Sequence, residues 1–163
     1  KSVEIVENNM PFSIKIEESK IGFSASHFLV NHEKCSRIHG HNYKISAEIS
    51  QLSGELDEKS MVMDFFDIKD ALRKIIEHLD HALLLPEKSE IIKIKEKNGQ
   101  ILVDMNGKHY EFPKEDVRLL PLKATTAELF AKYIYDQLKI QFPNFKLIIE
   151  VSESLGARAI YSQ

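Results

Sequence analysis

Residues 43–50 read YKISAEIS, with apolar side chains at the odd positions and polar side chains at the even ones. Successive side chains of a β-strand point to opposite faces, so this alternation predicts a strand with one face in the core and the other toward solvent. Half-buried strands of this kind are typical of antiparallel sheets. The stretch therefore predicts an antiparallel sheet that is covered on one face.

Similar patterns on both sides of residues 43–50 supply strand partners. Extended segments are predicted at 12–16, 21–29, 147–151 and 157–161. The first two are separated by a polar break at 17–20, and the second is expected to pair with 43–50 as a long hairpin. The hairpin and the two C-terminal segments together predict a core sheet of four antiparallel strands.

Two helices are predicted from apolar residues that recur at spacings of three and four. The first follows Asp64, a residue type that caps helix N-termini, and its apolar residues are Phe65, Ile68, Leu72, Ile75 and Leu79. The second opens with Thr125 and Glu128, which fit a capping box, and Phe142-Pro143 ends it. Its apolar residues are Leu129, Phe130, Tyr133, Ile134 and Leu138.

Residues 87–120 have a different character from the rest of the chain. Short β-type runs alternate there with Asn98-Gly99 and Asn106-Gly107, the residue pairs that favour the tight type I′ turns of hairpins. The segment is therefore predicted to be a small β-meander. The expected fold class is α+β: an antiparallel four-stranded sheet with two helices on one face and a meander inserted at about 87–120, all in a single domain spanning 1–163.

Composition narrows the function classes. The 163 residues include 22 basic and 25 acidic ones, for a formal charge of -3, which argues against nucleic acid as the main partner because phosphate binding rests on a basic surface. No apolar run approaches the ~18 residues of a membrane span, so no membrane association is expected. The single cysteine, Cys35, cannot form an intrachain disulfide and fits a reducing compartment, so we expect a cytoplasmic protein.

Three of the seven histidines lie where they could share a metal ion. His39 and His41 are one residue apart, so on a strand both side chains emerge on the same face, and His27 lies on the preceding strand of the predicted hairpin. Three neutral imidazoles suit Zn²⁺ and leave a fourth position open, as in catalytic zinc sites. A His-x-His pair by itself is more often solvated or hydrogen-bonded than bound to metal.

Cys35 and the pair Asp80-His81 are candidates for acid-base chemistry. Lys34 and Arg37 flank the thiol, and cations favour a reactive thiolate. Cys35 could equally be a small buried apolar residue or a fourth zinc ligand, and spacing does not decide between these roles. In Asp80-His81 a carboxylate could orient an imidazole and hold its charged form, although adjacent residues need not touch and a helix C-terminus favours a histidine cation anyway.

Glu153 ends the strand predicted at 147–151, where a carboxylate is ordinarily solvated. It could instead accept two parallel N–H groups from a guanidine-like ring edge, such as that of a purine or a pterin. Glu128, by contrast, is expected to serve mainly as a helix cap.

Taken together, these segments resemble the 6-pyruvoyl-tetrahydropterin synthase and 6-carboxytetrahydropterin synthase family. The matching stretches follow one another in family order: 23–27, 35–43, 61–65, 79–81, 126–128 and 151–153. Joint occurrence of so many short motifs is far more specific than any one of them.

The resemblance implies a role for each candidate residue. His27, His39 and His41 would be the zinc ligands. Cys35 would be the catalytic thiolate, and Asp80 and His81 would relay its proton. Glu153 would bind the pterin ring and is also counted among the catalytic residues, and Glu128 and Thr126 would lie in the same pterin-binding pocket. It also implies the tunnelling fold (T-fold), in which four-stranded sheets with two helices each form a trimeric barrel and two trimers stack as a homohexamer. Active sites lie between subunits, so Cys35 would meet the Asp80-His81 pair of a neighbour.

Within the family, three residues separate Cys35 from His39, which resembles the 6-carboxytetrahydropterin synthases, whereas the animal pyruvoyl enzymes have five. The resemblance thus predicts conversion of 7,8-dihydroneopterin triphosphate to 6-carboxytetrahydropterin, acetaldehyde and triphosphate, toward 7-deazapurine tRNA nucleosides such as queuosine. Lys34 and Arg37 are the cations nearest in sequence for the triphosphate, unless they are simply solvated. The meander at 87–120 is longer than the link of the usual bacterial enzymes and leaves the product open.

Three alternatives therefore stand beside this prediction. A 6-pyruvoyl-tetrahydropterin synthase would eliminate triphosphate at the same site. A three-histidine zinc hydratase or hydrolase would act through metal-bound hydroxide and would need neither Cys35 nor Asp80-His81. A non-catalytic pterin binder would keep affinity without turnover.

Overall fold

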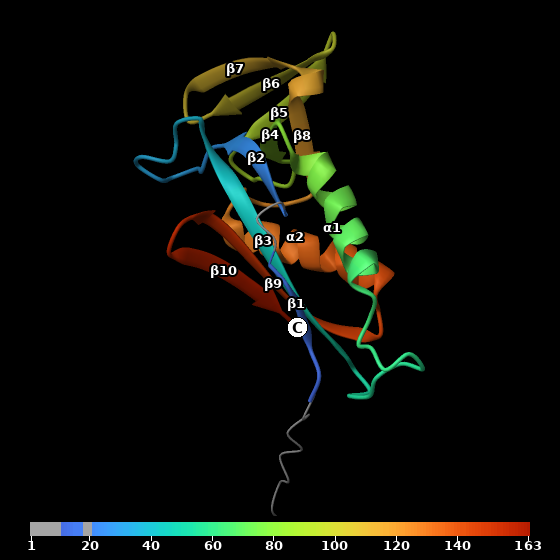
Figure 1. Ribbon diagram of the computed structural model, residues 1–163. Helices are drawn as coiled ribbons and strands as arrows, with labels where there is room; N and C mark the ends of the chain where they lie inside the picture. Colours follow the sequence, from blue (N-terminus) through green and yellow to red (C-terminus); the bar gives the residue numbers. More distant parts are fainter. Residues whose placement is uncertain (1–10, 18–20) are drawn as a thin grey trace, which may run out of the picture.

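The computed structural model of the protein describes residues 11–17 and 21–163. Two helices cover one face of a large sheet, and a smaller sheet packs at one end of it (Figure 1). The elements are β1 (Ile14–Ile16), β2 (Gly22–His27), β3 (His39–Gln51), α1 (Phe65–Leu79), β4 (Ala82–Pro86), β5 (Lys93–Lys97), β6 (Gln100–Met105), β7 (Lys108–Pro113), the 3₁₀ turn η1 (Lys114–Asp116), β8 (Val117–Leu120), α2 (Ala127–Gln141), β9 (Phe145–Ser154) and β10 (Ala157–Ser162). The break predicted at 17–20 lies mostly outside the described residues.

The large sheet has the strand order β10-β9-β3-β2-β4-β8, and β1 pairs with β3 beyond the end of β2. The four strands β10, β9, β3 and β2 are antiparallel neighbours, which confirms the predicted four-stranded antiparallel core. The sheet is nevertheless wider than predicted, because β1, β4 and β8 bring it to seven strands. It is also mixed, since β4 runs parallel to both β2 and β8.

Strand β4 was not predicted because its sequence does not alternate. It is buried along its whole length, and its side chains enter two different cores. Ala82 and Leu84 join the main core beneath the helices, whereas Leu83 and Leu85 join a second cluster on the opposite face. A strand that is covered on both faces has a continuous apolar sequence, as parallel strands commonly do.

Helix α1 begins as predicted, with the Asp64 carboxylate accepting the N–H of Phe66 at 2.8 Å. Ile68, Leu72 and Leu79 are fully buried against the sheet. The prediction was wrong for Phe65, whose side chain is 52% exposed because the first turn of the helix extends beyond the core.

Helix α2 begins one residue later than predicted. Its N-cap is Thr126, whose hydroxyl accepts the N–H of Leu129 at 3.4 Å, so the capping box of Thr125 and Glu128 does not form. Thr125 is instead buried, and its hydroxyl donates to the carbonyl of Phe28 at 3.2 Å. The helix ends at Phe142, as predicted.

The predicted meander is confirmed as the antiparallel sheet β5-β6-β7. Asn98, Gly99, Asn106 and Gly107 all have positive φ, as two type I′ turns require. The insert boundary was wrong at its C-terminal end, because β8 leaves the meander and pairs with β4 in the large sheet.

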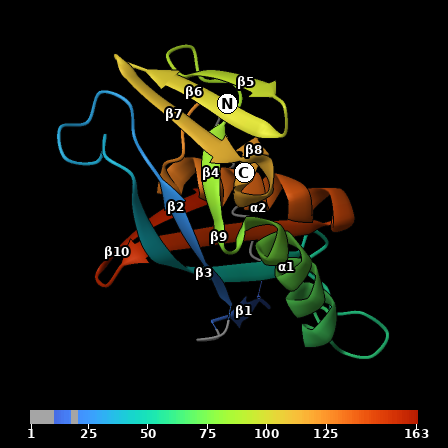
Figure 2. The ribbon, with the colours of Figure 1, turned by 90° about the horizontal axis from the view of Figure 1, so that it is seen from above.

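The meander covers the helix-free face of β4. Ile101, Val103 and Met105, the buried side chains of β6, pack in the second apolar cluster with Phe28, Leu83, Leu85 and Val117. Figure 2 shows this second layer above β4 and β8. Apolar burial therefore fixes the meander to the edge of the large sheet. In the described part of the chain, neither helix combines the length and the apolar character that crossing a membrane would require.

Candidate functional site

The β2–β3 hairpin brings the three candidate metal ligands together, as predicted. His27 lies opposite His39 in the antiparallel register, and His41 follows on the same face of β3. The ring centroid of His27 lies 4.6 Å from that of His39 and 5.2 Å from that of His41, and the His39 and His41 centroids are 5.0 Å apart. One donor atom from each residue lies within 4.8 Å of the other two, which is close enough for a shared ion.

Backbone carbonyls orient two of these imidazoles. The Nδ1 of His27 lies 2.7 Å from the carbonyl oxygen of Thr125, and the Nδ1 of His39 lies 2.8 Å from that of Arg37. A carbonyl only accepts, so each Nδ1 must carry the proton, and each Nε2 keeps its lone pair for another partner. The Nε2 of His27 is buried and has no hydrogen-bond partner among the described residues. A buried acceptor in that state fits a metal ion.

Burial also keeps His27 neutral. Removal from water lowers the pKa of its imidazole to about 4, the hydrogen bond to the Thr125 carbonyl opposes this change, and the neighbouring His39 and His41 add to it. A metal binds the neutral imidazole, so no proton competes with the ion at this ligand near pH 7.

Thr125 is therefore part of the support of the cluster, a role that sequence reasoning missed. Its carbonyl holds His27 and its hydroxyl is fixed to the Phe28 carbonyl, so it ties the start of α2 to the end of β2. No sequence pattern identifies a residue that acts through its backbone carbonyl. Its neighbour Thr126 caps α2 immediately beyond this contact, and Glu128 lies exposed in the first turn.

Glu153 lies on the same side of the sheet as the histidines. Lys44 pairs with Ser152, so Glu153 comes next along β9 and lies beside Tyr43. Burial, followed by the negative charge of Glu153, raises the pKa of the Tyr43 phenol. The Tyr43 and His41 ring centroids are 5.5 Å apart. Tyr43 thus lies next to Glu153 across the two strands and next to His41 along β3.

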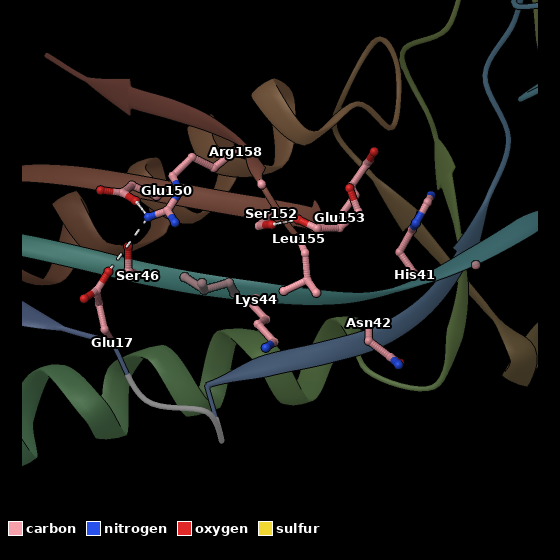
Figure 3. Close-up of a pocket in the computed structure, with 14 residues that line it drawn as sticks. Glu17, His41, Asn42, Lys44, Ser46, Glu150, Ser152, Glu153, Leu155 and Arg158 are labelled. Carbon is pink, nitrogen blue, oxygen red and sulfur yellow. Dashed lines mark hydrogen bonds and ion pairs between the residues drawn. The ribbon is translucent and has the colours of Figure 1, made fainter.

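A hollow of about 670 Å³ opens beside Glu153 and His41. Figure 3 shows both side chains pointing to the same side of β3 at one end of this hollow. At the other end Glu150 accepts from Arg158 at 2.7 Å and from Lys15 at 3.1 Å. Burial of Glu150 opposes its ionisation, but these two cations outweigh it and lower the carboxyl pKa. At one end of the hollow, therefore, the charge of Glu150 is balanced by two cations. At the other end lie the candidate site residues Glu153 and His41.

Asp80 and His81 form a contacting pair. The Oδ2 of Asp80 lies 2.8 Å from the Nδ1 of His81, and its Oδ1 accepts the backbone N–H of Ser24 at 2.7 Å. Burial alone would raise the pKa of Asp80, but the Ser24 N–H and the His81 ring outweigh it and lower the pKa. The ring of His81 is exposed and borders a second hollow, which is also lined by His41, Asn42 and Asp116.

His81 and the side chains of the histidine cluster lie toward opposite faces of the sheet. His81 occupies a left-handed turn just before β4 and borders a hollow with Ser24 and Asn42, which alternate with the core-facing residues of β2 and β3. His27 and His41 belong to the rows that continue into the main core. Within the described part of the chain, no direct polar or ring contact joins Cys35, Asp80 or His81 to the histidine cluster.

Cys35 lies in the loop between β2 and β3. Its carbonyl accepts from the N–H of Leu29 at 2.8 Å, and its own N–H donates to the Nδ1 of His32 at 3.0 Å. The residue is half-buried.

Comparison with known proteins assigns the family. The family model described as 6-pyruvoyl tetrahydropterin synthase matches residues 16–163. The chain belongs to this family. Relatives of the chain include proteins named 6-carboxy-5,6,7,8-tetrahydropterin synthase. That of Haemophilus influenzae is 32% identical over 74% of the chain and 79% of its own length. A putative one of Methanocaldococcus jannaschii is 34% identical over 85% of the chain and 88% of its own length.

Solved structures confirm the T-fold of the chain. The 6-pyruvoyltetrahydropterin synthase of Plasmodium vivax, in a variant whose catalytic glutamate is replaced by alanine, superposes with a TM-score of 0.84 at 26% identity. The match covers 93% of this chain and 97% of the other. The mixed sheet with two helices is therefore the architecture of the family and not a peculiarity of this member.

Proposed function

We propose that this chain is a zinc-dependent 6-carboxytetrahydropterin synthase, a lyase that converts 7,8-dihydroneopterin triphosphate to 6-carboxytetrahydropterin, acetaldehyde and triphosphate. The observation that carries the proposal is the cluster of three imidazoles at the end of the core, two of them with Nε2 left to bind a metal. The names of the relatives from H. influenzae and M. jannaschii support this product. The same chemistry would place the protein early on a route to 7-deazapurine tRNA nucleosides such as queuosine, in the cytoplasm.

His27, His39 and His41 would hold the zinc ion, because they offer three imidazole donors and leave a position for substrate oxygens. When bound, zinc supplies Lewis-acid polarisation of the side-chain hydroxyls of the substrate. The Thr125 and Arg37 carbonyls keep two of the imidazoles oriented for this task.

The remaining residues would bind the ring and move protons. Glu153 would accept two N–H groups from the pterin edge, with Thr126 and Glu128 at the adjacent start of α2. Cys35 would take and return the side-chain proton, and Asp80 would hold His81 ready to relay it. The P. vivax enzyme has a catalytic glutamate, so the catalytic residues of this family are not confined to a thiol, and Cys35→Ala tests the role of Cys35 in this chain.

The separation of the groups supports active sites shared between subunits. His81 borders the hollow on the helix-free face, while the side chains of the histidine cluster continue the core-facing rows of β2 and β3. A relay that serves the cluster would therefore come from a second copy of the chain. The family resemblance adds the form of the assembly, and on that basis we propose a homohexamer made of two stacked trimers.

A second candidate function is the elimination of triphosphate to give 6-pyruvoyl-tetrahydropterin. The family model and the P. vivax neighbour carry that name, and they favour it over a hydratase or hydrolase. The two pterin reactions share the substrate and the site, so their products distinguish them.

The test is incubation of the purified protein with 7,8-dihydroneopterin triphosphate and identification of the products by mass. Formation of 6-carboxytetrahydropterin with acetaldehyde, lost after chelation and regained with Zn²⁺, is expected. The double variant His39→Ala, His41→Ala should bind less than stoichiometric zinc and be inactive. A 6-pyruvoyl product would assign the second function, and zinc retained in the double variant would remove the metal assignment.

A further inference from the structure

The inserted meander touches the loop that carries Cys35. At its β6–β7 turn, the ammonium of Lys108 donates to the carbonyl oxygen of Ser36 at 2.8 Å. The adjacent turn residue Asn106 donates from its side-chain amide to that of Asn31 at 3.5 Å. Both views of the ribbon place this turn beside the loop between β2 and β3 (Figures 1 and 2).

The carbonyl that Lys108 holds lies between two functional positions. Ser36 follows Cys35 directly, and the next residue, Arg37, uses its carbonyl to orient the Nδ1 of His39. A displacement of the Ser36 peptide would therefore move the thiol and the support of a metal ligand together.

The loop has its own closing contacts, but these are local. Leu29 N–H donates to the Cys35 carbonyl at 2.8 Å, and Ser36 N–H donates to the His32 carbonyl at 3.0 Å. They shape the loop without fixing it to the rest of the protein. Lys108 supplies a tie from a separate sheet, and that sheet is anchored by its own apolar cluster.

An apolar contact supports the same tie at the start of the loop. The rings of Tyr110 in β7 and Phe28 stack with centroids 5.9 Å apart, and Val30 packs against the same cluster. Lys108 is half-buried, so its hydrogen bond is less exposed to competition from water than a surface contact would be.

We propose that Lys108 is a positioning residue of the active site, through which the inserted meander holds the Cys35 loop in its working geometry. The catalytic part of this inference rests on the proposed function, in which Cys35 moves the proton. The structural part does not, because it concerns the order of the loop in the free protein.

The test uses Lys108→Met, which keeps the length of the side chain and removes the donor. Lys108→Arg retains a donor, and Lys95→Met removes a cation from an exposed position in β5 of the same meander. Amide exchange of a peptide covering 29–38 is measured by mass spectrometry. Alkylation of Cys35 by iodoacetamide is measured in parallel, and it reports on the loop alone because the chain has one cysteine.

In Lys108→Met we expect exchange in the loop to be about tenfold faster, the effect of losing one hydrogen bond to a charged donor, with faster alkylation. Turnover of dihydroneopterin triphosphate should show a lower kcat with KM and zinc content unchanged. Lys108→Arg should restore all three readouts toward wild type, and Lys95→Met should leave them unchanged.

Exchange and alkylation in Lys108→Met that match Lys95→Met would overturn the inference. Faster exchange with an unchanged kcat would also overturn it, because the contact would then be structural only. If wild type itself turns over no dihydroneopterin triphosphate, the proposed function fails, while exchange and alkylation still decide whether Lys108 orders the loop.

Discussion

Mild acid should destabilise the metal-free protein through His27. The pKa of this imidazole is about 4 in the folded chain against 6.5 in the unfolded one, chiefly because the ring is buried. Between these values the unfolded state binds more protons than the folded state, so stability is lost as pH falls. The linkage relation gives a loss of about 2 kcal/mol at pH 5 and about 3 kcal/mol at pH 4, both relative to pH 7.

The assay is urea denaturation at pH 7 and pH 5, with chelator present and at one protein concentration so that metal and subunit association do not contribute. The matched control is His27→Gln, whose amide does not titrate and can still donate to the Thr125 carbonyl. Wild type should lose about 2 kcal/mol more than the variant between the two pH values.

Equal losses in wild type and in His27→Gln would refute the reasoning. They would mean that the ring is protonated in the folded state without penalty, and therefore that it is better solvated than the structure indicates. With Zn²⁺ added at pH 7, wild type should be stabilised more than the variant, because zinc binds the folded ligand set.

Three further outcomes test the chemistry. Cys35→Ala should keep its zinc and its melting temperature yet lose ~10²-fold or more in turnover, as when a positioned acid or base is removed, and near-normal turnover would end the catalytic assignment. Glu153→Gln should weaken pterin binding by about 1.5–3 kcal/mol in a calorimetric titration, because one acceptor becomes a donor, and unchanged affinity would return Glu153 to a solvated role. Cys35→Ala and His81→Ala subunits, inactive separately, should regain activity when unfolded and refolded together if sites are shared, whereas a mixture as inactive as its components would contradict shared sites.

A strand with one face toward solvent could be predicted from the sequence, whereas a strand buried on both faces could not. Residues 43–50 alternate because one side faces solvent, and they lie in β3 where the pattern predicted a strand. The run Ala82 to Pro86 carries no alternation, since the helices cover one face of β4 and the meander covers the other. A period of two requires a solvent face, so this strand left no such signal.

In the candidate site, too, some residues could be predicted from the sequence and others could not. The His-x-His spacing correctly predicted two imidazoles on one face of β3, because spacing along a strand fixes the direction of its side chains. The Thr125 carbonyl and the Lys108 ammonium could not be found from the sequence, since each acts on a partner about 70 or more residues away and no local pattern marks such a contact. Their contribution follows from the fold alone.

The inserted meander supports the candidate site through two sets of contacts, and the second apolar cluster holds the meander in place for both. Through Lys108 it holds the peptide that follows Cys35. Through Tyr110 it covers Phe28, whose carbonyl fixes the Thr125 hydroxyl, and the Thr125 carbonyl in turn orients His27. Removing the meander would expose the apolar side chains on the helix-free face of β4 and would also release both supports. The exposed turn of Asn98 and Gly99 lies at the opposite end of β6 from Met105 and takes part in neither contact, so lengthening this turn should leave both supports in place.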